Sequence, residues 1–140
     1  MIEIMKIEDK YLDGLKKMML QECLNFEDVS LCLDTLYIVA DRQEVLGFGY
    51  YNIYGNEIYL DHLYIKTNER LNKLGDSLFR TILNSLMLQG ADTVFMRADS
   101  HYDVFLKAEN IERKDDNYII HLNEFFSRKC RGSKKETPLN

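Results

Sequence analysis

The chain has 140 residues, enough for one domain with a sizeable core, and its 46% hydrophobic and 29% charged residues are typical of globular proteins. Its formal net charge of −5 argues against a general nucleic-acid-binding surface and is compatible with a cationic small substrate. No apolar run approaches the roughly 20 residues that a membrane-spanning helix needs, and the first residues lack a signal-peptide pattern, so we expect a cytoplasmic protein without a membrane partner.

The cysteines do not form a recognisable disulfide or metal-binding pattern. Cys23, Cys32 and Cys130 are three in number, none is spaced as C-x-x-C, and the three histidines are scattered along the chain. We therefore expect no metal site. Cys23 and Cys32 are read as small apolar filling residues, and Cys130 as an exposed thiol.

Hydrophobic periodicity predicts regular structure through residues 1–126, which we read as one domain. Strands are predicted at about 2–7, 35–40, 45–54, 57–65, 93–98 and 118–122, and helices at about 9–23, 73–89 and 100–109. Residues 24–33 mix apolar and acidic side chains and fit either a loop or a short helix. Residues 127–140 are polar and basic, typical of a flexible tail or, alternatively, of a contact with an acidic partner.

The connections between these elements predict the fold class. Short turns join the three strands between residues 35 and 65, which indicates an antiparallel meander. The helix at 73–89 then links the strands at 57–65 and 93–98, and a crossover of this length implies parallel pairing. The predicted fold is therefore α+β, with a mixed but mostly antiparallel sheet flanked by helices.

The stretch from Leu60 to Leu86 carries the strongest functional signal. A strand pattern ends at Ile65, a polar segment follows, and a helix begins near Lys73 with an apolar residue at every fourth position from Leu74. A strand, turn and helix in this order present unpaired backbone N–H groups at the helix N-terminus, where they and the helix dipole favour an anion. Gly75 has no side chain to keep a phosphate away from the backbone.

This stretch and the order of elements resemble the GNAT superfamily of acetyl-CoA-dependent N-acyltransferases over residues 1–124. Residues 70–75 are similar to the family's pyrophosphate loop: an Arg or Gln, two residues, a Gly, one residue, and a Gly or Ala. Arg70 and Gly75 match the first and last positions, whereas Lys73 stands where the family usually has its first glycine. The loop works mainly through backbone N–H groups, and a lysine adds a favourable charge beside a pyrophosphate.

The resemblance implies direct transfer of an acetyl group from acetyl-CoA, without a metal, to a primary amine on a small molecule or peptide. The cofactor-binding residues that it implies are Leu63, Tyr64, Ile65, Arg70, Leu71, Asn72, Lys73, Leu74, Gly75 and Asp76. The pantetheine arm would lie along the strand at 57–65, in the gap between it and the strand at 93–98. The N–H of Ile65 would lie near the thioester carbonyl. The acceptor is not named by the sequence, and a homodimer is left open.

The strand before the loop supplies the candidate base for this reaction. Asp61 is preferred, with Tyr59 as a second candidate, because several family members place a base at these positions. Period-two alternation would put Tyr59, Asp61 and Leu63 on one face of the strand and His62 on the other. The alternative is that Asp61 lies at a solvated rim or is paired with a basic side chain.

The candidate acid is Tyr102. Phe105 occupies the place where many family members have a tyrosine, and Tyr102 lies one helical turn earlier. His101 could substitute for it, and the alternative for Tyr102 is a residue that caps the core.

Two alternatives stay open for the whole chain. Lys73 and Phe105 favour a weak or inactive module that binds CoA or a protein partner, and an interaction domain without a CoA site is the other alternative. The tyrosines of the predicted meander either pack across the sheet or form an aromatic wall of a cleft: Tyr50, Tyr51, Tyr54, Tyr59 and Tyr64.

Overall fold

The computed structural model describes residues 1–98 and 100–127, except for the side chains of residues 71, 72, 100 and 101. Seven strands occur in the described chain: β1 (Ile2–Lys6), β2 (Leu36–Asp41), β3 (Glu44–Tyr54), β4 (Glu57–Ile65), β5 (Thr93–Arg97), β6 (Glu112–Lys114) and β7 (Asn117–His121). The helices are α1 (Leu12–Gln21), α2 (Glu27–Ser30), α3 (Leu74–Leu88) and α4 (Ser100–Ala108), and single 3-10 turns are η1 (Asp9–Tyr11), η2 (Leu33–Thr35) and η3 (Thr67–Asn72). None of these helices has the length and apolar character needed to cross a bilayer.

The strands form one sheet in the order β1-β2-β3-β4-β5-β7-β6. Every neighbouring pair is antiparallel except β4 and β5, which are parallel as the crossover through α3 predicted. The predicted α+β class, with its mostly antiparallel sheet, is confirmed.

Two short elements near the C-terminus were not predicted. β6 pairs with β7 through Glu112, Arg113 and Lys114, three exposed charged residues that carry no hydrophobic alternation. Residues 122–127 are helical, and Phe125 of this segment is buried. Ser127, predicted as the first residue of the tail, belongs to this helix, and residues 128–140 of the predicted tail lie outside the described residues.

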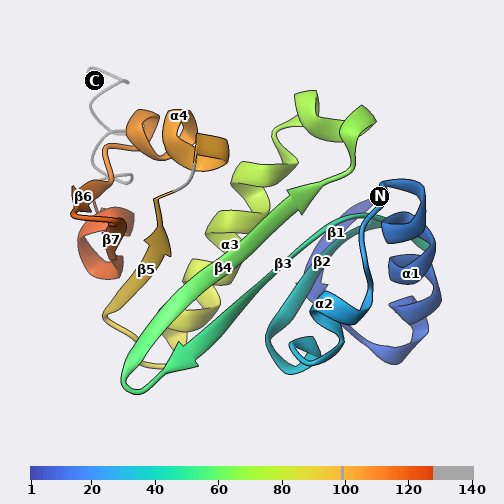
Figure 1. Ribbon diagram of the computed structural model, residues 1–140, viewed down its shortest axis with the longest axis horizontal. Coiled ribbons are helices and arrows are strands. Elements are labelled where there is room, and N and C mark those ends of the chain that lie inside the picture. The colour runs from blue at the N-terminus through green and yellow to red at the C-terminus, as the bar shows by residue number, and fades with distance from the viewer. Residues whose placement is uncertain (99, 128–140) are drawn as a thin grey trace.

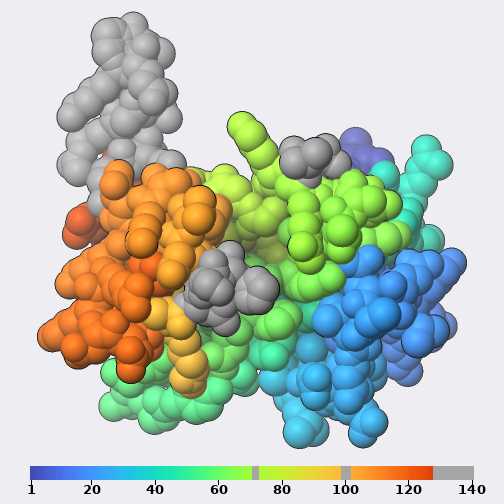
Figure 2. Space-filling view, turned by 45° about the horizontal axis from the view of Figure 1, so that its top comes forward, coloured from blue at the N-terminus to red at the C-terminus, as the bar shows by residue number. Residues whose placement is uncertain are grey.

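Helices cover both faces of the sheet (Figure 1). The apolar stripe of α3, including Leu78, Phe79 and Ile82, is fully buried in a cluster that continues across β4, β5 and β7. On the other face, α1 packs Leu15 and its neighbours against the inward side chains of β2 and β3. The sheet is therefore the central layer, and the N-terminal residues and the α4–β7 region flank α3 and η3 from opposite ends (Figure 2).

A β-bulge in β4 changes which residues face each helix layer. Tyr50 of β3 pairs with His62 and Tyr51 pairs with Leu60, so Asp61 is an extra residue without a partner in this register. A single extra residue reverses the alternation beyond it. Leu60 and Leu63 therefore both pack on the α3 side, although they are three residues apart.

The bulge overturns the predicted arrangement of faces on β4. Leu63 does not share a face with Asp61, because it packs in the α3 cluster. His62 does not point away from Asp61: its ring stacks on Tyr50 at 5.7 Å between centroids, and Asp61 bonds Asn52 and Tyr54, which alternate with Tyr50 on the same face of β3.

Candidate active site

β4 and β5 separate immediately beyond the bulge. Their register contains one pair, Tyr59 with Phe95, and the two strands diverge towards their C-terminal ends (Figure 1). A bulge increases the local twist of its strand, which accounts for the loss of pairing at this point. The part of β4 from Asp61 to Ile65 therefore presents a sheet edge between β3 and the start of α4.

Backbone groups of Leu63 and Ile65 point into this gap. The N–H of Lys66 donates to Leu46 O on β3 at 2.7 Å, so by alternation the odd-numbered residues 63 and 65 direct their groups away from β3. The hydroxyl of Tyr102, on α4, lies 3.3 Å from both the N and the O of Leu63. Nε of Arg70 donates to the Ile65 carbonyl at 2.9 Å. Two side chains thus already bond the edge groups of β4.

The N-terminus of α3 lies at the end of the same edge. Its first helical hydrogen bond runs from the N–H of Ser77 to the Lys73 carbonyl, so the N–H groups of Leu74, Gly75 and Asp76 precede the helical ladder. A Cβ added at Gly75 would meet only Ile65 Cγ1, at 3.7 Å, which is ordinary van der Waals contact. The protein itself leaves room at Gly75, and these donors suit an anion.

Glu22 fastens the segment that leads to this helix. One oxygen, Oε1, accepts bonds from the Tyr64 hydroxyl at 2.7 Å and from the N–H and hydroxyl of Thr67 at 3.0 and 2.7 Å. These hydrogen bonds lower the pKa of Glu22. The bond from Tyr64 has the largest effect, and those from Thr67 follow. The carboxylate at the end of α1 therefore holds the beginning of η3 next to β4.

Replacing Glu22 by glutamine is expected to lower stability at neutral pH by about 1 kcal/mol or less, because the carboxylate is partly solvated. Because the pKa of Glu22 is lower in the folded than in the unfolded state, its carboxylate stabilises the fold at pH values above the unfolded pKa of 4.5. This contribution is lost as the pH falls through the folded-state pKa. The free energies of unfolding of the parent and of Glu22→Gln should therefore differ at pH 7, and the difference should shrink as the pH falls below 4.5.

Glu27→Gln is the matched control, since no side-chain bond of Glu27 is seen in the described structure and the residue is exposed. Parallel unfolding curves for the parent and Glu22→Gln across the whole pH range would contradict the anchoring role of Glu22.

A cleft of about 430 Å³ opens beside the divergence of β4 and β5. Such a volume accommodates a small molecule. Its lining comes from α2, β3, β4, β5, α4 and the loop before η2: Asp28, Cys32, Tyr50, Asn52, Tyr54, Leu60, Asp61, Arg97 and Tyr102. Asp61 and Tyr102, the predicted base and acid, therefore line one cleft.

Asp61 is held in a fixed orientation within the cleft. Oδ2 accepts hydrogen bonds from Asn52 Nδ2 at 2.8 Å and from the Tyr54 hydroxyl at 2.7 Å. Oδ1 lies 3.8 Å from Nε of Arg97, and 16% of the Asp61 side chain is exposed. The carboxylate is thus oriented through one oxygen, while the other faces Arg97 without a hydrogen bond to it.

Two tyrosines of the cleft keep their protons at neutral pH. Burial, together with nearby negative charge, raises the pKa of Tyr50 to about 12. The hydrogen bond that Tyr54 donates to Asp61 raises the pKa of Tyr54. Both therefore act as neutral hydroxyl groups in the cleft.

The comparisons with known proteins bear on the fold. No family model and no curated protein matches the chain. Among solved structures, a GNAT-family acetyltransferase from Staphylococcus aureus Mu50 matches with a TM-score of 0.67 and 13% identity, over 87% of this chain and 99% of its own. PaiA N-acetyltransferase from Thermoplasma acidophilum, solved with coenzyme A, matches with a TM-score of 0.63 and 16% identity, over 85% and 96% of the two chains. The ribosomal-protein-S18-alanine N-acetyltransferase from Escherichia coli gives 0.63 and 13%, over 85% and 91%.

The chain has the GNAT acetyltransferase fold. Against the GNAT loop pattern described above, the one departure is Lys73, whose φ of 59° and ψ of 22° lie in the left-handed region. A side chain in that region costs about 1 kcal/mol, which explains why a glycine suits this position. The backbone at Lys73 still turns as the first residue before α3, so the substitution leaves the start of the helix in place.

The other predicted loop residues differ in what they contribute. Leu74 is buried in the core, and Arg70 lies over the Tyr64 ring at 5.0 Å from its centroid. Oδ2 of Asp76 accepts from Arg80 at 2.9 Å, while its Oδ1 is buried without a hydrogen-bond partner in the described structure. The side chains of Leu71 and Asn72 lie outside the described part.

The predicted proton-transfer residues separate into two groups. Tyr102 reaches the edge of β4, whereas Phe105 packs edge-on against Phe79 of α3 at 5.1 Å. Tyr59 is not among the residues that line the cleft: its ring stacks on Phe95 at 5.3 Å and its hydroxyl accepts from Asn117 at 3.3 Å. The side chain of His101 lies outside the described part.

Several cleft residues were not singled out from the sequence as site residues. Asn52 and Arg97 are polar residues within predicted apolar strands. Such positions indicate that the side chain lies in a polar environment of the fold. Tyr50 and Tyr54 belong to the aromatic cluster whose cleft-wall alternative is the one the structure favours for these two. Asp28 gave no signal, because α2 is too short to show a helical pattern.

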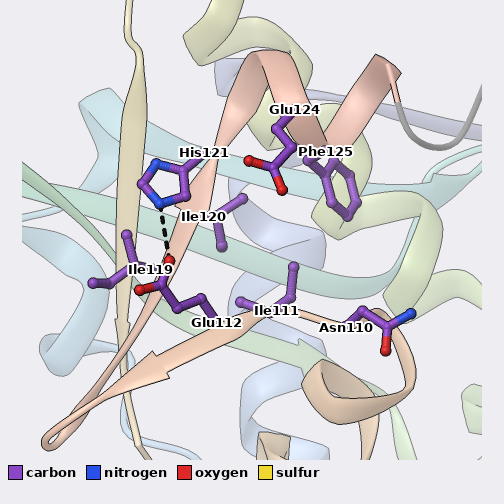
Figure 3. A pocket seen from close by; sticks show the side chains of 8 residues that line it. All are labelled: Asn110, Ile111, Glu112, Ile119, Ile120, His121, Glu124 and Phe125. Carbon is purple, nitrogen blue, oxygen red and sulfur yellow. Dashed lines mark hydrogen bonds and ion pairs between the residues drawn. The ribbon is translucent and has the colours of Figure 1, made fainter.

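Two other hollows lie away from the divergence of β4 and β5. Figure 3 shows one beneath β6, β7 and the following helix, where His121 bonds Glu112 at 3.1 Å, but its volume of about 40 Å³ holds only water molecules. A hollow of about 400 Å³ between α1 and the β2–β3 turn has its polar lining at exposed positions such as Lys17 and Gln43. Within the described residues, no three His, Cys, Asp or Glu side chains converge as metal ligands.

Proposed function

We propose that the protein is an N-acetyltransferase that moves an acetyl group from acetyl-CoA directly to a primary amine. The observation that carries this proposal is the convergence at Leu63, where the open edge of β4, the Tyr102 hydroxyl and the cleft of Asp61 meet. The GNAT fold supports it, since neighbours with that fold include N-acetyltransferases, and PaiA N-acetyltransferase was solved with coenzyme A.

The described residues fit acetyl-CoA at three places. The N–H groups of Leu74, Gly75 and Asp76 precede the helical ladder of α3, and Gly75 places no side chain beside them, which suits the pyrophosphate. Lys73 adds a positive charge beside them. The outward groups of Leu63 and Ile65 suit the amides of the pantetheine arm, provided that Tyr102 and Arg70 release them.

The reaction needs a neutral amine nucleophile and a stabilised oxyanion. When bound, acetyl-CoA supplies the acetyl group as a thioester. Oδ1 of Asp61 accepts the proton of the amine, directly or through a water, while Asn52 and Tyr54 hold the carboxylate through Oδ2. The donor that we assign to the developing oxyanion is the N–H of Leu63 rather than that of Ile65, because it lies 3.3 Å from the hydroxyl of Tyr102, which lines the cleft.

Tyr102 is the residue we assign to protonate the departing thiolate. Its hydroxyl lies at the Leu63 edge groups, at the junction of the gap and the cleft. A positioned general acid typically contributes about 100- to 10,000-fold to a rate, and less when the leaving group is a thiol with an ordinary pKa of about 8.5.

One further function is favoured by a specific observation. The bonds from Arg70 to Ile65 and from Tyr102 to Leu63 occupy the groups that a pantetheine arm would use. A protein that keeps these bonds would be a weak or inactive module that binds CoA, or a protein partner, without turnover. Lys73 in place of glycine favours the same alternative.

Two measurements separate these functions. Acetyl-CoA at about one hundred times its Kd should stabilise the fold by roughly 3 kcal/mol in a thermal-shift assay if it binds. Release of free thiol from acetyl-CoA across a panel of primary amines then reports turnover. Binding without thiol release for any amine would favour the inactive module. No thermal shift would exclude both the acetyltransferase and a module that binds CoA, and would leave only a module that binds a protein partner.

Replacing Tyr102 by phenylalanine is expected to lower kcat by about 10- to 100-fold while the Kd for acetyl-CoA changes little, because only the hydroxyl is lost. Tyr118→Phe is the control. It removes a hydroxyl on β7 that donates to Asp103 of α4 at 2.7 Å, and neither residue lines the cleft. If both variants keep the parent kcat, Tyr102 is not the acid.

A further inference from the structure

Arg97 is the one cationic residue that lines the cleft among those described, and the proposed reaction makes no use of it. It is the last residue of β5, where strand alternation buries Val94 and Met96 against α3 and turns Phe95 and Arg97 towards Tyr59. Its side chain remains 56% exposed although three neighbours surround its charge. A cation is therefore presented at the mouth of the cleft.

Two aromatic rings fix the orientation of this cation. The guanidinium carbon lies 4.6 Å from the ring centroid of Tyr59 and 5.4 Å from that of Tyr54, and the two rings meet edge to face at 5.4 Å. Stacking on aromatic faces engages the plane of a guanidinium and leaves its in-plane N–H donors directed outward. Tyr59, predicted as catalytic, thus acts as a platform for Arg97.

The ion pair with Asp61 does not use up these donors. Nε of Arg97 and Oδ1 of Asp61 are 3.8 Å apart, which is beyond hydrogen-bond distance. An arginine kept to stabilise a buried carboxylate would be expected in a short bidentate pair. Asp61 takes its hydrogen bonds from Asn52 and Tyr54 instead, so both charges remain available to a ligand.

The cleft consequently carries both signs of charge side by side. Asp61 and Asp28 supply negative charge, and Arg97 supplies positive charge within the same 430 Å³. A ligand that meets Asp61 and Arg97 together must carry its own positive and negative groups within a few bonds of each other. A simple amine would bring no negative group to bind the guanidinium of Arg97, and the second positive charge of a diamine would be repelled by it.

We propose that the acceptor is a free amino acid, whose carboxylate is bound by the Arg97 guanidinium while its amine lies at Asp61. This inference rests on the proposed acetyltransferase function for the turnover that it predicts. Planar bidentate recognition of a carboxylate is the interaction that a stacked arginine provides and that a lysine provides only in part.

The test compares free amino acids with their C-terminal amides, which keep the amine and lose the negative charge. In the parent, kcat/KM for thiol release from acetyl-CoA is expected to be at least ten-fold higher for the preferred acid than for its amide. Arg97→Gln should abolish this preference, mainly through the KM of the acid, and Arg97→Lys should restore part of it. Arg113→Gln should keep the preference, since Arg113 lies over Tyr118, 5.7 Å from its ring centroid, on exposed β6.

A binding measurement separates this inference from the proposed function. Titration of the protein with each acid and amide, in the presence of CoA, reports recognition without turnover. Binding of acids but not amides, lost in Arg97→Gln, with no thiol release would uphold Arg97 as the group that binds the carboxylate of a free amino acid, and would overturn the acetyltransferase proposal. Equal kcat/KM for acids and amides, an equal loss of both in Arg97→Gln, or turnover confined to amines without a carboxylate would overturn the inference and leave the proposed function standing.

Discussion

Replacing Gly75 by leucine is expected to weaken acetyl-CoA binding by at least about 10-fold, or 1.4 kcal/mol, without lowering the stability of the fold. Gly75 has a helical backbone, and a Cβ there meets only Ile65 Cγ1 at 3.7 Å, so the backbone accepts a Cβ without a clash. Leucine is a better helix former than glycine by about 1 kcal/mol. Its side chain would occupy the space in front of the N–H groups that we assign to the pyrophosphate.

Calorimetric titration with acetyl-CoA and thermal unfolding without ligand measure the two effects separately. Ser77→Leu is the matched control, because Ser77 lies in the same turn of α3 and is exposed. It should leave the Kd unchanged within about two-fold. An unaltered Kd in Gly75→Leu would show that the start of α3 does not hold the pyrophosphate, and the assignment of the loop would fall.

Replacing Asp61 by asparagine is expected to lower kcat by about 100-fold or more, since a general base contributes on this scale. The change is nearly isosteric, and the amide oxygen can still accept from Asn52 and Tyr54, so the cleft should keep its shape. What is lost is the proton acceptor at Oδ1. Steady-state thiol release over a range of pH, with one amine acceptor, measures the loss and the altered shape of the pH–rate profile.

Asp103→Asn is the control for Asp61→Asn. Asp103 also accepts a hydrogen bond from a tyrosine, Tyr118, at 2.7 Å, but it lies on α4 outside the lining of the cleft. It should reduce stability more than turnover. A pH–rate profile that is the same in the parent and in Asp61→Asn would remove Asp61 from the role of base, whatever the size of the rate change.

The bulge at Asp61 shows why the geometry of the candidate site was only partly predictable. Ile58 and Leu60, at even-numbered positions, face α3, and so do Leu63 and Ile65, at odd-numbered positions. Both pairs can face α3 only because one extra residue lies between them. The sequence does not reveal this, because Tyr59, His62 and Tyr64 make both faces of the strand look apolar. Regular alternation was therefore the simpler interpretation, and it placed Leu63 and His62 on the wrong faces.

Local patterns were sufficient for the elements and for the loop. The four-residue spacing of α3, the short turns of the meander and the crossover to β5 depend on residues close together in the chain, and they predicted the sheet order from β2 to β5. Arg70 and Gly75 indicated the candidate anion site for the same reason: a helix N-terminus after a strand is a local feature.

The chain alone thus determined the fold class and indicated three candidates: the helix start as an anion site, Asp61 as a base and Tyr102 as an acid. Only the tertiary structure decided that Tyr102 and not Phe105 reaches β4, that Tyr59 supports Arg97, and that Asn52 and Tyr54 orient Asp61. The physical reason is that these contacts join residues on different elements, and their existence depends on where β4 bulges and leaves β5. That point is fixed by packing against α3, which no local pattern of residues specifies.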